Sequence, residues 1–502
     1  MDLKRIVVAV VALLVVAGLV LGAVSGIFAS VARQGLEAAG LETPRAPSTL
    51  PASALDPSAS GTAGATSPAA SAAPSTTAPS TAAPSTAGPD GAVALPAPVL
   101  AGTEGQGTVS GAALSDRIRG VKVKDSGGYS GEVRDMRTGA VVFSHRAGSG
   151  AIPASTTKLV TAAAALDLLG AEHRFTTSVV AAGKGRVVLV GGGDPYLLEK
   201  GSSDQPTRAS LSTLARRTAT ALKADGVRKV SLGYDASLFS GPAWNPTWPG
   251  SYGDVASRVS ALWVNEGRTT PGGGVLGPRE GDPAKDAAKA FASQLEKQGI
   301  DVGGVSTARA GKDATRLAAV SSMTLERIVE HVLMTSDNDG AEVLLRQAGV
   351  AGGRKGSFAD GTAVVAARLK DLGAWTSGTR LVDGSGLSRS TRIPAATLTK
   401  LLRVAGEESH PQLRPLITGL PVAGVEGSLA TRFGDDESLA GRGVVRGKTG
   451  TLSKVHGLAG TITTRDGSVL AYAFLVNDPK NDYNATVWLQ RVTAAISTCG
   501  CR

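Results

Sequence analysis

The amino-acid sequence predicts an α/β (α+β) protein, in which an antiparallel sheet is flanked by helices and interrupted by an inserted, mainly β/α segment. Two short apolar stretches separated by a turn, residues 131–136 and 140–145, are typical of a strand pair, and an Ala- and Leu-rich helical pattern follows them. Further strand patterns at 457–463 and 468–476 precede a helical pattern at 484–497. The 502 residues exceed what one hydrophobic core holds, so we expect two or three folded units.

The first 32 residues predict a membrane segment. Lys4 and Arg5 precede a run without charged residues from Ile6 to Ala32. At about 1.5 Å per residue this run can cross a bilayer core of about 30 Å. It is either an uncleaved anchor or a cleaved signal peptide with its cleavage site at 30–32, and its length favours the anchor. With either alternative, the rest of the chain is exported to the extracytoplasmic face of the membrane or the wall space.

Residues 33–110 predict a disordered linker rich in Pro, Ser, Thr and Ala. Between Ala46 and Thr103 the only charged residues are Asp56 and Asp90, aromatic residues are absent, and Ala-Pro-Ser-Thr units repeat. A segment with so few large apolar residues cannot bury enough surface to offset its chain entropy. We therefore expect compact structure to begin just after this linker.

The remaining sequence predicts one unit made of residues 111–170 and 318–502, with residues 171–317 inserted into it. Within the insert, strand patterns alternate with amphipathic helical patterns, and the glycines at 191–193 indicate a turn, because no Gly-Lys-Ser/Thr follows to form a phosphate loop. The predicted strands not yet named are 175–180, 186–190, 227–232 and 443–451, and the predicted helices are 211–224, 284–298, 324–335, 340–348 and 395–407.

Composition excludes several classes of function. The net charge is +10, but the basic residues are scattered among acidic ones, so we expect no nucleic-acid partner. The five histidines are dispersed and form no His-Glu-x-x-His pattern, and the two cysteines lie at the C-terminus, so the sequence predicts neither a metal nor a cofactor. A Gly-x-Ser-x-Gly nucleophile motif is also absent.

Ser155 and Lys158 form a Ser-x-x-Lys motif at the start of the Ala/Leu-rich helical pattern. Residues three apart share one face of a helix, so an amine lies beside a hydroxyl. A serine hydroxyl becomes a strong nucleophile when a base takes its proton, and lysine can be that base if burial or a neighbouring cation lowers its pKa. The motif alone is weak evidence, because it is short and also fits a solvated helix face.

Two further motifs follow in order: Ser336-Asp337-Asn338 where a helix meets a loop, and Lys448-Thr449-Gly450 on a glycine-rich strand. The three motifs together are the signature of serine penicillin-recognising enzymes. In such a site Ser155 attacks an amide and Lys158 takes its proton, while Lys448 lowers the pKa of Lys158. Ser336 relays the proton to the leaving group and Asn338 holds a substrate amide. The alternatives are a helix N-cap for the second motif and an exposed strand end for Lys448.

About 180 residues separate Ser155 from Ser336, which leaves room for an inserted domain. With this spacing the chain resembles the class C, type-4 penicillin-binding proteins, the D-alanyl-D-alanine carboxypeptidases/endopeptidases of the S13 peptidase family. The segments that carry the resemblance, besides the three motifs, are residues 173–177, 193–195, 244–249, 383–388 and 427–429.

The resemblance implies a β-lactamase/transpeptidase-like domain and a penicillin-sensitive serine D,D-carboxypeptidase that removes the terminal D-alanine of peptidoglycan stem peptides, with D,D-endopeptidase activity as a second expectation. Ser155 and Thr451 would supply the oxyanion N–H groups, and Thr449, Gly450 and Thr451 would bind the substrate beside Lys448. β-Lactams would be covalent inhibitors. A β-lactamase-like hydrolase and a non-catalytic wall-binding protein of the same fold remain the alternatives, and the oligomeric state stays open.

Overall fold

The computed structural model describes residues 109–270 and 277–500. The predicted membrane segment, residues 1–32, and nearly all of the predicted linker, residues 33–110, lie outside the described residues. Among the helices that are described, none combines the length and the apolar character needed to span a bilayer.

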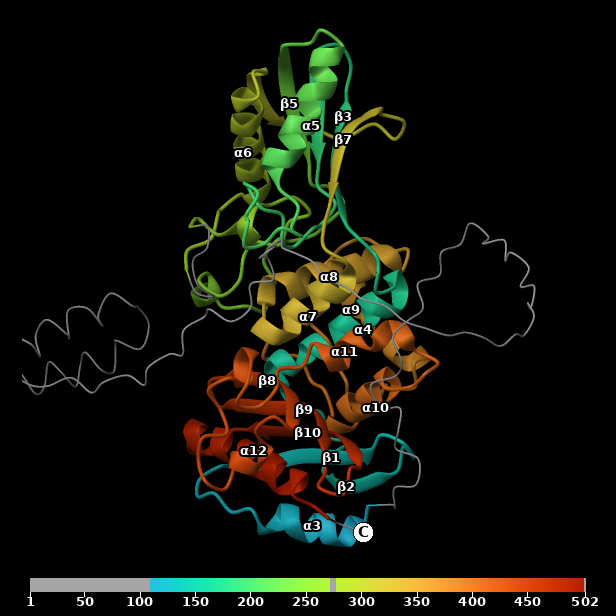
Figure 1. The fold of residues 1–502 in the computed structure, drawn as a ribbon, viewed down its shortest axis with the longest axis vertical. Helices are drawn as coiled ribbons and strands as arrows, with labels where there is room; N and C mark the ends of the chain where they lie inside the picture. The colour runs from blue at the N-terminus through green and yellow to red at the C-terminus, as the bar shows by residue number, and fades with distance from the viewer. Residues whose placement is uncertain (1–108, 271–276, 501–502) are drawn as a thin grey trace, which may run out of the picture. The chain divides into compact units, whose positions relative to one another are not determined.

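The first sheet is antiparallel throughout and joins strands from the two ends of the described chain (Figure 1). Strand β1 (Tyr129–Asp135) lies between β2 (Val141–His145) and β10 (Val469–Asn477), and β9 (Val455–Thr463) and β8 (Val445–Leu452) complete the sheet. This arrangement confirms the predicted antiparallel sheet, in which β2 and β8 are the two edge strands.

Helices cover both faces of this sheet. Side chains alternate between the two faces along each strand, so each face presents its own set of residues to a helix. Helices α3 (Gly111–Gly120) and α12 (Asp482–Ser497) pack with the even-numbered residues of β10 in one core. Helix α10 (Ala395–Ala405) packs on the opposite face, with Ala471, Ala473 and Leu475. The predicted α/β (α+β) fold with a helix-flanked antiparallel sheet is therefore confirmed.

A layer of helices lies beyond α10 and is centred on α4 (Thr157–Leu169), which is buried along most of its length. The helices that surround α4 are α7 (Leu325–Thr335), α8 (Asn338–Ala351), α9 (Phe358–Asp371) and α11 (Pro415–Thr418). The short 3-10 helices of the described chain are η1 (Ala154–Thr156), η2 (Gly250–Tyr252), η3 (Asn265–Gly267), η4 (Pro411–Leu413), η5 (Gly427–Leu429) and η6 (Leu439–Gly441).

The second sheet is built only from residues between α4 and α7, in the order β6-β5-β4-β3-β7. Its strands are β3 (Thr176–Ala181), β4 (Arg186–Val190), β5 (Lys229–Asp235), β6 (Asp301–Thr307) and β7 (Arg316–Ser321). The strands β4, β5 and β6 are parallel, and the helices α5 (Leu211–Ala224) and α6 (Pro283–Lys297) connect them and pack on the sheet. Parallel strands require such crossover helices.

Candidate active site

Ser155 lies in the 3-10 helix η1, which continues directly into α4, and Lys158 lies in the first turn of α4. The Lys158 Nζ donates a hydrogen bond of 2.9 Å to the Ser155 Oγ. Ala154 has a φ of 46°, in the left-handed region that only glycine adopts at no cost, so the backbone is strained next to the serine. The predicted contact between hydroxyl and amine is present.

Lys158 is fully buried and has two further acceptors. Its Nζ donates to the Asn338 Oδ1 over 2.8 Å and to the Ser385 carbonyl oxygen over 3.0 Å. The Asn338 Nδ2 donates to the Val255 carbonyl oxygen over 3.0 Å, which turns the amide oxygen toward the lysine. The first and second motifs therefore meet at one amine.

Burial lowers the pKa of Lys158 to about 8. The negative charges of Asp337, Glu342, Asp383 and Asp339 oppose this effect and raise the pKa, because they favour the charged ammonium. From the sequence we predicted that Lys448 lowers this pKa, whereas in the structure the largest cause is the loss of solvent. A lysine with a pKa near 8 is neutral in an appreciable fraction of molecules at neutral pH, as a general base must be.

The second motif forms the turn between α7 and α8. Ser336 has a φ of 62° and ends α7 in the left-handed conformation, and Asp337 is the N-cap of α8. The Asp337 carboxylate accepts hydrogen bonds from the backbone N–H groups of Asp339 and Gly340, over 3.0 and 2.9 Å. The alternative of an N-cap therefore applies to Asp337. Ser336 and Asn338 lie directly before and after this capping residue.

Residues 383–388 form a buried loop beneath Ser155. The Glu342 carboxylate accepts from the backbone N–H groups of Gly384 and Ser385, and the Asp383 carboxylate accepts from the Trp248 Nε1 over 2.9 Å. A Cβ on Gly386, whose φ is +85°, would lie 1.9 Å from the Ala154 carbonyl oxygen. The loop therefore packs directly under η1, a supporting role that the sequence motif did not reveal.

The third motif lies on β8, next to η1. Lys448 is fully buried, and its Nζ donates to the Thr449 carbonyl oxygen over 3.0 Å. Burial, with Lys158 as the second cause, places the pKa of Lys448 well below its usual value. The alternative of an exposed strand end is thus wrong for Lys448, and the two lysines are close enough for one charge to affect the other.

Thr449, Gly450 and Thr451 continue this strand past Ser155. The Thr449 Oγ1 donates to the Ser428 Oγ over 3.0 Å, so the 427–429 segment supports the strand. A Cβ on Gly450 would lie 2.5 Å from the Pro153 carbonyl oxygen, so glycine is what allows β8 to approach η1 this closely. Thr451 is exposed. Of the predicted site residues, Ser155, Lys158 and Asn338 are hydrogen-bonded together, and the others line the adjoining turn and strand.

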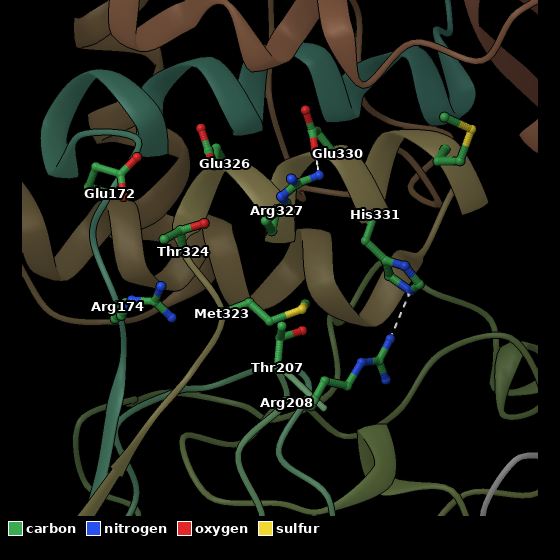
Figure 2. Close-up of a pocket in the computed structure, with 11 residues that line it drawn as sticks. Glu172, Arg174, Thr207, Arg208, Met323, Thr324, Glu326, Arg327, Glu330 and His331 are labelled. Carbon is green, nitrogen blue, oxygen red and sulfur yellow. Dashed lines mark hydrogen bonds and ion pairs between the residues drawn. The ribbon is translucent and has the colours of Figure 1, made fainter. Parts of the chain in front are cut away.

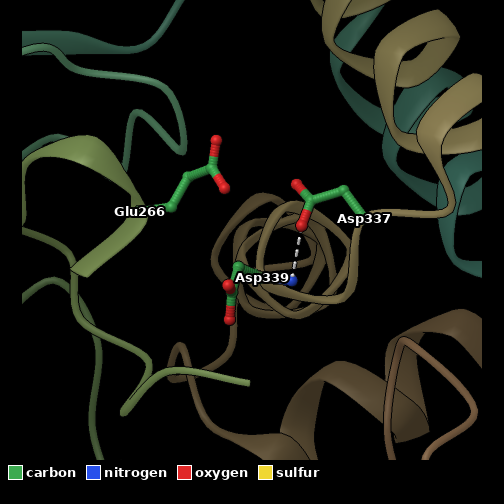
Figure 3. Close-up of side chains that lie close together, drawn as sticks. All are labelled: Glu266, Asp337 and Asp339. Atoms are coloured by element: carbon green, nitrogen blue, oxygen red, sulfur yellow. Dashed lines mark hydrogen bonds between the residues drawn. The ribbon is translucent and has the colours of Figure 1, made fainter. Parts of the chain in front are cut away.

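Three carboxylates meet beside the second motif, with one oxygen each of Glu266, Asp337 and Asp339 within 4.8 Å of one another (Figure 3). Such a group could hold a cation by its spacing alone. Arginines already lie against it, however: Arg268 pairs with Glu266 over 2.7 Å and Arg279 pairs with Asp339 over 3.2 Å. The cluster is therefore an ion-pair network at the N-terminus of α8.

A groove of about 780 Å³ runs along α7 (Figure 2). Acidic side chains and basic side chains both line it, and at one end the Arg208 Nη2 lies 3.4 Å from the His331 Nε2. None of the predicted site residues lines this groove. Its lining residues are Glu172, Arg174, Thr207, Arg208, Met323, Thr324, Glu326, Arg327, Glu330, His331 and Met334.

Comparison with known sequences matches most of the described chain. The sequence fits the family described as D-Ala-D-Ala carboxypeptidase 3 (S13) over residues 119–272 and 275–495. A carboxypeptidase of Mycobacterium tuberculosis is 36% identical over 388 residues, which cover 75% of this chain and 82% of that protein. A D-alanyl-D-alanine carboxypeptidase of an Actinomadura species is 29% identical over 478 residues, covering 76% of this chain and 85% of that protein.

Comparison with solved structures shows the same fold. The crystal structure of penicillin binding protein 4 (dacB) from Haemophilus influenzae aligns with a TM-score of 0.61 at 21% sequence identity. The alignment covers 76% of this chain and 98% of that protein. The two proteins therefore share a fold.

Proposed function

Because the chain belongs to the D-Ala-D-Ala carboxypeptidase 3 (S13) family, we propose that it is a penicillin-sensitive carboxypeptidase whose nucleophile is Ser155 and whose substrate is the peptidoglycan stem peptide. The observation that carries the serine assignment is the 2.9 Å hydrogen bond between the Lys158 Nζ and the Ser155 Oγ. The amine has a pKa of about 8, so it can accept the serine proton near neutral pH.

In the acylation step the Ser155 Oγ attacks the carbonyl carbon of the penultimate D-alanine, and Lys158 takes the hydroxyl proton. The backbone N–H groups of Ser155 and Thr451 stabilise the oxyanion, since η1 and β8 lie against each other. The C–N bond then breaks, and the proton held by Lys158 passes by way of the Ser336 hydroxyl to the departing amino group of the terminal D-alanine. Water hydrolyses the resulting ester, which releases the shortened peptide and restores the Ser155 hydroxyl.

The terminal carboxylate of the substrate is held by the third motif. The Thr451 hydroxyl donates to it, and the Thr449 hydroxyl does so by turning from its contact with the Ser428 Oγ, while Lys448 adds positive charge next to it when protonated. Asn338 holds the substrate amide, with its orientation set by the Val255 carbonyl oxygen and Lys158. A β-lactam would acylate Ser155 by the same attack, because its ring amide takes the place of the peptide bond. We expect the reaction to take place outside the cytoplasm, where peptidoglycan lies.

Covalent labelling with a fluorescent penicillin tests the nucleophile. We expect the unchanged protein to take one label and Ser155→Ala to take none, while Ser149→Ala, a change at an exposed serine nearby, labels normally. Release of D-alanine from a stem pentapeptide should follow the same pattern. Labelling that survives in Ser155→Ala would refute the assignment, and labelling without D-alanine release would favour the non-catalytic wall-binding alternative.

Cleavage of peptide cross-links is a second activity of the same acyl-enzyme chemistry, because the leaving group is again the amine of a D-centre. Mass spectrometry of peptidoglycan fragments after incubation separates the two activities, since a carboxypeptidase releases free D-alanine and an endopeptidase converts dimers to monomers. Rapid turnover of the penicillin label would instead indicate a β-lactamase-like hydrolase.

A further inference from the structure

Tyr196 reaches the second motif from the segment that carries the second sheet. Its hydroxyl donates a hydrogen bond of 2.7 Å to the Asp337 Oδ2, and its side chain is almost completely buried. The tyrosine follows the turn that leaves β4. It lies 141 positions before Asp337 in the chain. No sequence pattern predicted this contact, because a tyrosine after a glycine-rich turn fits any buried loop.

The turn before Tyr196 is hydrogen-bonded to helix α8. The Gln347 Nε2, on α8, donates to the Gly192 carbonyl oxygen over 2.7 Å. The Trp263 Nε1 donates to the carbonyl oxygens of Asp194 and Pro195 over 3.2 and 3.1 Å. The backbone of the turn is therefore anchored to α8, the helix that begins at the second motif.

The tyrosine ring itself is enclosed. The Arg208 guanidinium carbon lies 4.6 Å from the ring centroid, and the His331 ring meets it edge to face at 4.7 Å. Arg208 and His331 are the pair seen at the end of the groove in Figure 2. A Cβ on Gly340 would lie 2.5 Å from both the Tyr196 oxygen and the Asp337 Oδ2, so a glycine at this position makes room for the hydroxyl.

Asp337 stands between the two residues of the motif that the reaction uses. Ser336, just before it, is held in the left-handed conformation, and Asn338, just after it, contacts Lys158. Two of the hydrogen bonds to the Asp337 carboxylate come from backbone groups of its own helix, as in any N-cap. The bond from Tyr196 is different, because it ties the turn to another part of the fold.

We propose that Tyr196 is a positioning residue of the active site, whose hydroxyl fixes Asp337 and thereby sets Ser336 and Asn338 relative to Lys158. This inference rests on the proposed function. It assigns a role to the segment between α4 and α7, which supplies the tyrosine and also the Val255 carbonyl oxygen that orients Asn338. The reaction would therefore depend on a hydroxyl that never touches the substrate.

The test compares Tyr196→Phe with Tyr234→Phe in the full chain. Both tyrosines are buried residues of the same segment, and each hydroxyl makes one side-chain hydrogen bond, but that of Tyr234 joins Thr307 at 3.0 Å within the second sheet. Losing a hydrogen bond to a charged group should slow acylation by the fluorescent penicillin about tenfold in Tyr196→Phe. Tyr234→Phe should acylate at the rate of the unchanged protein.

Two readouts separate positioning from a general loss of structure. At long times Tyr196→Phe should still take a full equivalent of label, because every molecule is folded. The acylation rate of Tyr196→Phe should rise with pH, and the midpoint of this rise should equal that of the unchanged protein, because the charges around Lys158 are retained. An unchanged acylation rate in Tyr196→Phe would overturn the positioning role, and so would a substoichiometric final label. A wild-type protein that takes no label would overturn the proposed function, and the inference with it.

Discussion

Replacing Asp337 by Asn should move the pH dependence of acylation to lower pH. Asp337 is the foremost of the four carboxylates whose negative charge raises the pKa of Lys158, against the larger effect of burial. Removing that charge leaves burial less opposed, so the pKa of Lys158 must fall. Asn can still cap α8, because its one amide oxygen can accept from one of the two backbone N–H groups that Asp337 binds.

The size of the effect follows from the fraction of neutral amine. With a pKa of about 8, about one molecule in ten carries a neutral Lys158 at pH 7, and about one in a hundred does so at pH 6. Acylation of the unchanged protein should therefore rise about tenfold per pH unit below its midpoint. Each unit by which the substitution lowers the pKa should raise the neutral fraction at pH 6 about tenfold.

The assay is the second-order rate constant of labelling by the fluorescent penicillin, measured from about pH 5.5 to about pH 9.5 so that the range spans the pKa of Lys158. The maximum rate of Asp337→Asn should fall, because the contact with Tyr196 changes, so the diagnostic quantity is the midpoint and not the maximum. Asp371→Asn is the matched control, since it removes one negative charge from an exposed side chain. A flat profile in the unchanged protein would refute Lys158 as the base, and an unshifted midpoint in Asp337→Asn would refute its electrostatic role.

Two further predictions concern residues that support the site, and a third substitution serves as a control. Gly386→Ala should destabilise the fold by at least about 2 kcal/mol in denaturant unfolding, because its Cβ would meet the Ala154 carbonyl oxygen and its φ is positive. Gly373→Ala, with positive φ but nothing within 4 Å, should cost only about 1 kcal/mol, and equal losses would contradict the packing argument. Burial raises the pKa of Asp194 to about 7, so the stability that this group contributes is present at low pH and is lost as the pH rises through about 7. The melting temperature of Asp194→Asn relative to the unchanged protein should therefore rise between about pH 5 and about pH 8, and a constant difference would refute the raised pKa.

The residues of the three motifs could be predicted from the sequence because each motif combines a residue type with a fixed local geometry. Ser155 and Lys158 are one turn apart, so a helix alone brings them together. The helix at 211–224 was also predicted with its observed ends, since its apolar periodicity is clear and Ser210 caps it. Local signals of this kind predict the folded structure correctly, because they depend on neighbouring residues and not on distant ones.

Other elements were missed where tertiary contacts override local preference. Helix α9 contains Gly361, which disfavours a helix, but a Cβ there would lie 2.5 Å from the Leu345 carbonyl oxygen, so the glycine serves the packing of α9 on α8. Strand β6 has adjacent glycines and is largely exposed, and it forms because β5 offers it a parallel edge. Helix α3 and strand β7 were likewise not predicted.

The electrostatics of the site could not be predicted for the same reason. The three motifs together predicted that Lys448, as a second cation in the site, lowers the pKa of Lys158, but the pKa of a buried group depends first on how much solvent it has lost. The groups that surround Lys158 come from distant parts of the chain, and the Ser385 carbonyl oxygen that it contacts lies 227 positions away. Only the folded chain shows which carboxylates remain near enough to oppose the burial. The motifs therefore lead to the proposed reacting groups, whereas the reactivity of these groups depends on loops and helices that carry no recognisable signature.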